Sequence, residues 1–318
     1  MKKVFITGGT GTVGKAFISK YYKKYKFYSY ARNEKAQVGL KRLFPKIEII
    51  IGGIENASLL TNEISKIKPD IIIHAAALKH VDTAEKQPSQ AVLTNVIGSY
   101  NLIQAAITSE VELTVGISTD KACNADNIYG QTKYIMEKLF LEANSSRIKF
   151  VCCRFGNVAW SNGSVIPFWL TRKANQQELL LTDKKMSRLM FSQNDSARLI
   201  KKCIEDSSNE GGFILSKKMK TVNMFKMAKL ISNEIKVTGL RPGEKLFEDL
   251  ISDRELPYTY LDGDYIFLRN EINKDINTRL KNKLSSQNAE EMNDSEMNHL
   301  IKNVNDIISS KLIDQQNY

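Results

Sequence analysis

Short apolar runs alternate with longer amphipathic segments over the first half of the chain. The runs lie at residues 4–6, 27–30, 47–51, 71–77, 113–117 and 151–154, and the segment at 15–25 that follows the first run has the spacing of a helix. Buried strands that alternate with helices are typical of right-handed βαβ units in a parallel sheet. The pattern predicts an α/β fold of the Rossmann type, a doubly wound parallel sheet with a smaller C-terminal substrate lobe.

The pattern changes after residue 159. Residues 160–270 are less regular, with Pro167, a polar stretch at 171–187 and the pair Gly211 and Gly212. We expect this part to form mainly a substrate lobe, with some segments returning to the first domain. Residues 271–318 are polar, and we expect an extension that is partly helical. Its sparse apolar residues are Leu300, Ile301, Val304, Ile307 and Ile308.

A glycine-rich run joins the first strand to the first helix. Its residues are Thr7, Gly8, Gly9, Thr10, Gly11, Thr12, Val13 and Gly14. Glycines permit a tight turn and let the backbone approach a pyrophosphate, whose charge the helix N-terminus favours. Although such a run can be merely a turn, its place between strand and helix predicts a dinucleotide site.

The end of the second strand indicates which dinucleotide binds. An acidic residue there holds the ribose 2′-hydroxyl of NAD, whereas an arginine accommodates the 2′-phosphate of NADP. Here the strand ends in Ala31 and Arg32, with no carboxylate in the sequence beside Arg32 until Glu34. The sequence therefore favours NADP and assigns residues 1–159 to an NADP-binding Rossmann domain. The alternative is that Arg32 is an ordinary solvated charge.

Candidate catalytic residues follow the apolar run 113–117. Thr119, Asp120 and Lys121 should lie at the carboxyl end of a parallel strand, where such sheets bind ligands. Tyr129 and Lys133 are four apart on the next helix, so the lysine charge is expected to lower the phenol pKa. The alternative is an ordinary exposed helix pair and an N-terminal aspartate cap.

Composition argues mainly against other classes of protein. The chain has 318 residues, 42% of them hydrophobic, and no apolar stretch long enough to span a membrane. The first strand begins too close to Met1 for a signal peptide, so a cytoplasmic protein is expected. The four cysteines lack metal-ligand spacing and only three histidines are present, so no metal is expected. The net charge of +11 is spread along the chain without a nucleic-acid motif, which argues against a nucleic-acid partner.

Several further motifs occur in a fixed order along the chain. They are His74-Ala-Ala-Ala-Leu-Lys-His80, Thr94-Asn-Val-Ile-Gly98, Ser118-Thr-Asp-Lys-Ala122, Tyr129-Gly-Gln-Thr-Lys133, Arg154-Phe-Gly-Asn-Val158, Met186-Ser-Arg188 and Arg241-Pro-Gly-Glu-Lys245. Over residues 3–252 the chain resembles the extended short-chain dehydrogenases/reductases. Within them it is similar to the inverting UDP-N-acetylglucosamine 4,6-dehydratases, in which an Asp-Lys pair follows the threonine.

The resemblance implies roles for the catalytic candidates. Tyr129, assisted by Lys133 and Thr119, would take the proton of the C4 hydroxyl while a hydride passes to NADP. Lys121 would then remove the C5 proton if burial lowers its pKa, and Asp120 would protonate the leaving C6 hydroxyl. The alternative is that Asp120 and Lys121 form a structural ion pair.

The resemblance also implies binding residues and a homo-oligomer. Besides the glycine-rich run, Arg32, Tyr129 and Lys133, the expected cofactor-binding residues are Gly53, Ile54, Ala75, Ala76, Ala77, Lys79 and Asn95. Those expected to bind UDP-N-acetylglucosamine or a related UDP-sugar are Lys79, His80, Arg154, Asn157, Arg188, Arg241 and Glu244. For His80 a structural role is the alternative.

The chain also departs from the family pattern. Ala31 replaces a serine, Gly53 replaces an acidic residue expected to read adenine, and Trp160 and Asn162 replace a glycine and an arginine beside the pocket. Two other functions stay open: a UDP-N-acetylhexosamine 4-epimerase, which would need Tyr129 and Lys133 but not the Asp-Lys pair, and a non-catalytic NADP-binding regulator.

Overall fold

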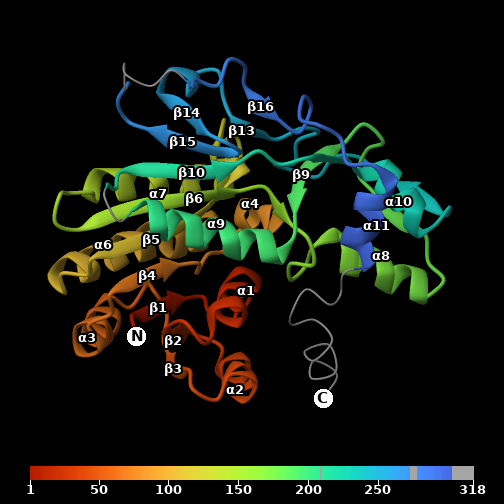
Figure 1. Ribbon diagram of the computed structural model, residues 1–318. Helices are drawn as coiled ribbons and strands as arrows, with labels where there is room; N and C mark the ends of the chain where they lie inside the picture. The colour runs from red at the N-terminus through yellow and green to blue at the C-terminus, as the bar shows by residue number, and fades with distance from the viewer. Residues whose placement is uncertain (208–209, 273–277, 303–318) are drawn as a thin grey trace.

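The centre of the molecule is one large sheet in the order β14-β15-β10-β6-β5-β4-β1-β2-β3 (Figure 1). The computed structural model describes residues 1–207, 210–272 and 278–302. The first six strands pair in parallel, and β10 continues the parallel order beside β6. They are β1 (Lys3–Thr7), β2 (Lys26–Ala31), β3 (Glu48–Ile51), β4 (Ile71–His74), β5 (Leu113–Thr119), β6 (Lys149–Phe155) and β10 (Phe213–Lys217). The predicted doubly wound α/β fold is confirmed.

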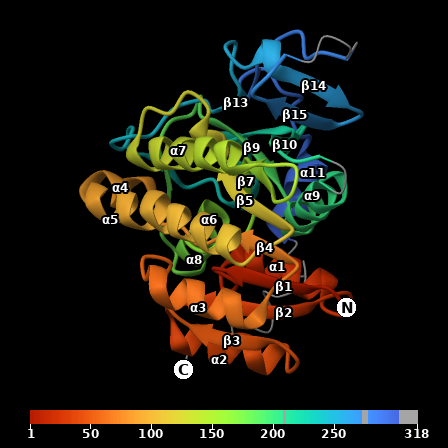
Figure 2. The same ribbon diagram turned by 90° about the vertical axis from the view of Figure 1, so that its left-hand side faces the viewer.

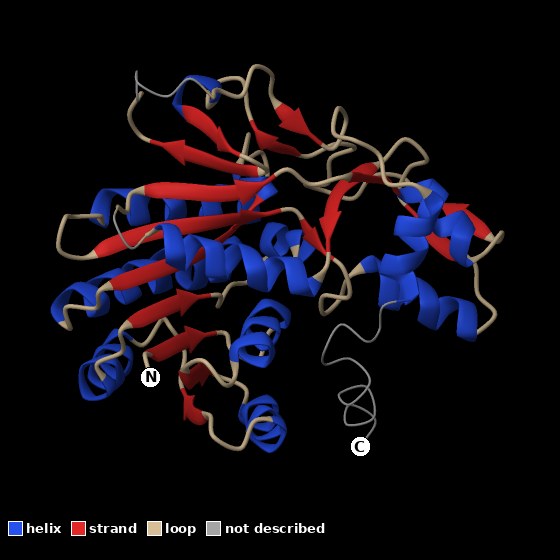
Figure 3. Cartoon of the chain, in the orientation of Figure 1, coloured by secondary structure: helices blue, strands red, loops and turns tan. Residues whose placement is uncertain are grey.

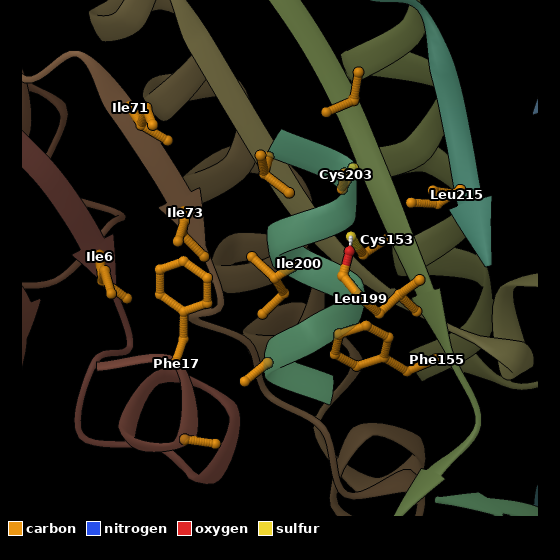
Figure 4. Close-up of a cluster of buried hydrophobic side chains, with 14 of the residues drawn as sticks. Ile6, Phe17, Ile71, Ile73, Cys153, Phe155, Leu199, Ile200, Cys203 and Leu215 are labelled. Carbon is orange, nitrogen blue, oxygen red and sulfur yellow. Dashed lines mark hydrogen bonds between the residues drawn. The ribbon is translucent and has the colours of Figure 1, made fainter. Parts of the chain in front are cut away.

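Helices cover both faces of this sheet, as the doubly wound pattern requires. On one face lie α1 (Thr12–Tyr21), α2 (Glu34–Leu43) and α9 (Gln193–Asp206). Figure 4 shows Phe17 of α1 and Ile200 of α9 against Ile6 and Ile73 of the sheet. The other face carries α3 (Ala57–Ile67), α6 (Gly98–Thr108) and α7 (Ile128–Ala143), seen from outside in Figure 2.

A second lobe stands beside the carboxyl ends of the strands (Figure 3). It contains the sheet β11-β9-β7, made of β7 (Asn157–Val158), β9 (Ser187–Phe191) and β11 (Thr221–Asn223), and the pair β8 (Leu179–Leu181) and β12 (Ile235–Val237). Its helices α8 (Val165–Ala174), α10 (Met224–Ile231) and α11 (Asp294–Lys302) enclose a separate apolar core. Leu300 and Ile301 of α11 belong to this core, whereas Val304, Ile307 and Ile308 lie outside the described residues.

The remaining elements return to the main sheet or connect its parts. The antiparallel strands β14 (Thr259–Asp262) and β15 (Tyr265–Arg269) extend the sheet beyond β10. The other elements are the pair β13 (Asp249–Ile251) and β16 (Leu284–Ser285), helices α4 (Val81–Lys86) and α5 (Pro88–Val92), the π-helical turn Leu93–Ile97 and the 3₁₀ turns Asp120–Ala122 and Leu256–Tyr258.

Two local expectations need correction. The fourth strand ends at His74, because the amide of Ala75 donates to Thr7 and the chain then crosses the glycine-rich loop instead of extending to residue 77. The first helix ends at Tyr21 and does not continue to Tyr25, and the amide of Lys24 donates to the carbonyl of Tyr21 in the turn that follows.

All four cysteines are free and buried. Among the described helices, none has the length and apolar character needed to cross a bilayer.

Candidate active site

A cavity of about 1070 Å³ lies between the carboxyl ends of the strands and the second lobe. The glycine-rich loop, the ends of β2, β3 and β5, and the start of α7 form its sheet side, while residues from Gly156 to Glu248 form much of the opposite wall. Ligand sites commonly enclose about 300–1,000 Å³. The cavity is therefore slightly larger than a common site for one small ligand.

The glycine-rich loop fits a dinucleotide phosphate. Gly8 has φ +68°, and a Cβ there would lie 2.7 Å from the amide nitrogen of Ala76. A Cβ on Gly14 would lie 2.7 Å from the Cα of Gly9, so the loop and the first turn of α1 can pack together only without side chains. Helix α1 begins at this loop, and no side chain caps its N-terminus. The amides of its first turn are therefore available to donate hydrogen bonds to an anion.

The members of this run divide into two groups. Gly8, Gly11, Gly14, Thr10, Thr12 and Val13 line the cavity, as expected for a cofactor cradle. Thr7 and Gly9 stand behind it. The hydroxyl of Thr7 bonds Nδ1 of His74 at 2.8 Å and accepts from the amide of Ala76, while a Cβ on Gly9 would lie 2.4 Å from Oγ of Ser29. These two residues support the loop, and their direct contact with a cofactor stays a prediction.

The 75–80 segment forms the next part of the wall. Ala75, Ala76, Ala77, Lys79 and His80 all line the cavity. Asn95 stands behind them, 1% exposed, and bonds the amide and the carbonyl of Leu78 and the hydroxyl of Thr132. The expectation that Asn95 binds the cofactor is therefore corrected: its side chain holds the segment against α7.

The catalytic candidates come together at the end of β5. Asp120 and Lys121 form a 3₁₀ turn, and Asn127 caps α7 by accepting from the amide of Gly130. A Cβ on Gly130 would lie 2.1 Å from the carbonyl oxygen of Lys121, so the turn and the helix approach as closely as backbone allows. This contact explains the glycine after Tyr129, and Thr119, Lys121, Tyr129 and Lys133 all line the cavity.

Lys121 lies between two buried carboxylates. Its Nζ is 3.1 Å from Oδ1 of Asp120 and 3.4 Å from Oε1 of Glu248. Burial acts to lower the pKa of Lys121, but the charges of Asp120 and Glu248 outweigh it and raise that pKa. The condition stated for Lys121 as a base, a lowered pKa, is therefore not met in this structure. Burial also raises the pKa of Glu248, against the opposing charge of Lys121.

The pKa values of the Tyr–Lys pair also differ from expectation. Burial raises the pKa of Tyr129 to about 12, and the charge that partly offsets this effect is that of Lys121. Lys133 instead directs Nζ toward Sδ of Met136 at 2.8 Å, and burial lowers its own pKa to about 8. The predicted lowering of the phenol pKa by Lys133 is therefore wrong.

Arg154 does not reach the cavity. Its guanidinium donates to both carboxylate oxygens of Glu137, to both of Glu255 and to the carbonyl of Leu250, at 2.7–3.1 Å. All five of its N–H donors are thus used inside the protein. The expectation that Arg154 approaches the UDP moiety is corrected: it ties β6 to α7 and to the Leu256–Tyr258 turn.

The other expected substrate residues do line the cavity. Arg188 is 6% exposed and donates to the backbone carbonyls of Ser187, Lys245 and Leu246. Arg241 pairs with both carboxylate oxygens of Glu244, at 3.1 and 2.9 Å. Burial would raise the pKa of Glu244, but the hydrogen bond and charge of Arg241 lower it. Asn157 lies at the start of β7.

The loop at 160–163 closes over the glycine-rich loop. The amide of Asn162 donates to the hydroxyl of Thr12 at 3.1 Å, and its carbonyl accepts from Nζ of Lys79 at 2.6 Å. Trp160 has φ +60°, a conformation that a glycine adopts without strain. Its indole points away and donates to the carbonyl of Leu300 in α11. Trp160 thus stands beside the cavity, between lining residues Ala159 and Ser161, with its indole directed away from it.

Sequence reasoning missed three carboxylates that line the cavity, Glu55, Asp82 and Glu248. Glu248 follows the Arg241 to Lys245 motif by three residues, a spacing with no recognised meaning. Glu55 follows the substituted Gly53 and brings a carboxylate to 3.8 Å from Arg32 in space, although none stands beside Arg32 in the sequence until Glu34. Within the described ranges no group of His, Cys, Asp and Glu side chains is placed to hold a metal ion.

A glycine cradle at the first strand and a Tyr-x-x-x-Lys helix on one cavity define the extended short-chain dehydrogenase/reductase class. The chain belongs to a family described as polysaccharide biosynthesis protein, whose model matches residues 4–269. It is 35% identical over 81% of its length to the UDP-N-acetylglucosamine 4,6-dehydratase (inverting) of Campylobacter jejuni, covering 80% of that protein.

Two further similarities complete the comparison. The chain is 34% identical to a UDP-glucose 4-epimerase of Rickettsia massiliae, over 80% of this chain and 79% of that one. The X-ray structure of Pen from Bacillus thuringiensis superimposes with a TM-score of 0.89 at 31% identity, covering 96% of this chain and 98% of that chain.

Proposed function

We propose that this protein is an NADP-dependent 4,6-dehydratase of UDP-N-acetylglucosamine, or of a related UDP-sugar, that inverts C5. The observation that carries the proposal is the Asp120–Lys121 pair, whose lysine lines the same cavity as Tyr129. A 4-epimerase needs a base only at the C4 hydroxyl, whereas dehydration also needs an acid and a base at C5 and C6. The similarity to the Campylobacter jejuni dehydratase supports the same reading.

Each side chain has a separate task in this chemistry. Bound NADP supplies a hydride acceptor at C4 and a hydride donor at C6. Tyr129 must first release its own phenol proton, a step that the charge of Lys121 favours. The phenolate then accepts the proton of the C4 hydroxyl, and the ketone so formed acidifies the C5 hydrogen. Lys121 removes that hydrogen as a proton, and Asp120 in its protonated form gives its proton to the C6 hydroxyl, which leaves as water. Lys121, now carrying the C5 proton, can return a proton to Asp120 across 3.1 Å. Delivery of a proton to the opposite face of C5 gives the inverted product.

The proton of Lys121 must move before the lysine can act as a base. Asp120 and Glu248 each have a buried carboxylate oxygen that lacks a hydrogen-bond partner within the described residues, so both can accept a proton. Burial raises the pKa of Glu248, which favours Glu248 as an acceptor. Transfer from Lys121 to Glu248 across 3.4 Å produces a neutral amine beside the substrate and removes two buried charges.

The remaining residues are assigned to binding. The glycine-rich loop would hold the pyrophosphate, Arg32 the 2′-phosphate, and Gly53, Ile54 and the three alanines at 75–77 the nucleoside. Arg188, Arg241 and Glu244 would hold UDP, where a diphosphate competes with Glu244 for Arg241. Lys79, His80 and Asn157 would line the sugar.

A homo-oligomer is also proposed. Exposed apolar side chains gather on the segment from α5 to α6 and on neighbouring α7, a pattern common at subunit contacts. They are Val92, Leu93, Ile97, Tyr100, Tyr134 and Ile135. Cytoplasmic location stays a prediction of the sequence.

Two alternative interpretations keep specific support: 4-epimerisation of the sugar, and a structural ion pair of Asp120 and Lys121. The Rickettsia massiliae similarity favours 4-epimerisation, and the raised pKa of Lys121 suits an ion pair that does not react. A non-catalytic regulator is disfavoured because Tyr129 and Lys133 are both retained in the cavity.

The test of the proposed function is mass and NMR analysis of UDP-N-acetylglucosamine incubated with the purified protein and NADP. Loss of one water with inverted C5 supports the proposal, and a product of unchanged mass epimeric at C4 contradicts it.

A further inference from the structure

Two residues of opposite charge meet at the carboxyl ends of β2 and β3. Nη1 of Arg32 lies 3.8 Å from Oε1 of Glu55, and both residues line the large cavity. The Arg32 side chain is 67% exposed, whereas that of Glu55 is 31% exposed. The arginine is therefore free to move toward a ligand, while the carboxylate is held by its surroundings.

The local backbone explains why Glu55 points into this corner. A Cβ on Gly53 would lie 2.2 Å from Oε1 of Glu55, so the carboxylate occupies the space that a side chain at position 53 would fill. Asn101 donates to the carbonyls of Ile54 and Glu55, and Asn56 caps α3, which fixes the backbone on both sides. Oε2 of Glu55 is buried and lacks a hydrogen-bond partner within the described residues.

These two side chains have opposite preferences for the adenosine ribose. A carboxylate accepts a hydrogen bond from a free 2′-hydroxyl, whereas an arginine accommodates a 2′-phosphate. A phosphate monoester carries a charge of about −1.5 to −2 at neutral pH. Glu55 would repel that charge and also neutralise the arginine that attracts it.

We propose that Glu55 is a specificity-determining residue for the cofactor, which opposes a 2′-phosphate at Arg32 and accepts a hydrogen bond from a 2′-hydroxyl. The site then binds both NAD and NADP, and Glu55 limits the preference for NADP that Arg32 creates. The inference rests on the dinucleotide site of the proposed function and is independent of the reaction at the sugar.

Binding of two small nucleotides tests the inference without any turnover. Dissociation constants for 5′-AMP and adenosine 2′,5′-bisphosphate are measured by calorimetry on the intact chain. Glu55→Gln should shift the ratio of affinities toward the 2′-phosphate by about tenfold, the order expected for one charge removed at this distance near the surface. Gly53→Ala should shift the ratio the same way, because its methyl group displaces the carboxylate without removing it.

Two controls frame the result. Glu112→Gln makes the same charge change at an exposed residue just before β5, at the opposite end of the strands, and should leave the ratio unchanged. Arg32→Ala should shift the ratio toward 5′-AMP. If both nucleotides bind but neither Glu55→Gln nor Gly53→Ala moves the ratio of their affinities, the proposed role of Glu55 is overturned, whereas the dinucleotide site stands. If the parent protein binds neither nucleotide, the dinucleotide site itself is overturned.

Discussion

Lys121 and Glu248 face each other across 3.4 Å inside the cavity, although one lies just after β5 and the other just before β13. The segment that leads into β13 thus contributes a carboxylate to a pair whose lysine lies at the end of β5. Because Glu248 is 2% exposed, it interacts with Lys121 in a medium that screens charge weakly. The charge of Glu248 therefore adds to that of Asp120 in raising the pKa of Lys121.

Glu248→Gln tests this effect. The variant loses the acceptor for the lysine proton, so turnover should fall by at least about a hundredfold, the lower range for general acid–base catalysis. It also loses one of the two charges that raise the pKa of Lys121, so the rise of activity with pH should move to lower pH. The measurement is the pH profile of kcat, with Glu248→Asp as the partial rescue. An unmoved profile would assign Glu248 a purely structural role.

Tyr129→Phe removes the proposed acceptor of the C4 hydroxyl proton. Oxidation at C4 should slow by about a hundredfold or more, while UDP affinity and thermal stability stay near those of the parent. Single-turnover formation of NADPH, followed by its absorbance, measures this step. Tyr134→Phe, one turn further along α7 and exposed, is the matched control. Near-parent turnover in Tyr129→Phe would remove the tyrosine from the mechanism.

Arg154→Met should act on stability rather than on UDP binding. Removing one member of a buried ion pair costs about 3–5 kcal/mol, because Glu137 and Glu255 would keep uncompensated charges. Chemical denaturation measures the loss, with exposed Arg147→Met as the control. Arg154→Lys, which retains the charge, keeps the UDP comparison possible if Arg154→Met fails to fold. A tenfold loss of UDP affinity in Arg154→Lys at parent-like stability would return this residue to the substrate site.

The same cluster predicts an acid-sensitive contribution to stability. Burial would raise the pKa of Glu255, but the charge and hydrogen bonds of Arg154 lower it to about 2. Because this folded-state pKa lies below the unfolded value, the contribution is fully present above about pH 4.5 and is lost as pH falls toward 2. The shift corresponds to about 3 kcal/mol. The difference in unfolding free energy between parent and Glu255→Gln should therefore shrink over that range, and a constant difference would contradict the assignment.

The main fold could be predicted because its signals are local. Strand runs and the glycine turn each depend on neighbouring residues, and parallel strands with crossover helices allow few arrangements. The end of β4 was missed because Ala75, Ala76 and Ala77 look like a strand, although they leave the sheet to pass Gly8.

The site residues were grouped correctly where one strand end and the next helix carry them. The pKa expectations failed because they depend on charges far away in sequence. Glu248 reaches Lys121, and Glu137 and Glu255 enclose Arg154, through contacts that no spacing rule indicates. Glu55 was missed because its carboxylate folds back over Gly53, a geometry that the letters of the sequence do not show.

The most direct test of the account follows hydrogen at C5. Turnover of UDP-N-acetylglucosamine in heavy water should give a product that has lost water and carries solvent deuterium at C5, measured by NMR and mass spectrometry. Lys121→Ala should abolish this exchange while Tyr129 still permits C4 oxidation and NADPH accumulates on the protein. Retention of the original hydrogen at C5 during turnover, or exchange that persists in Lys121→Ala, would contradict the role of Lys121 as the base.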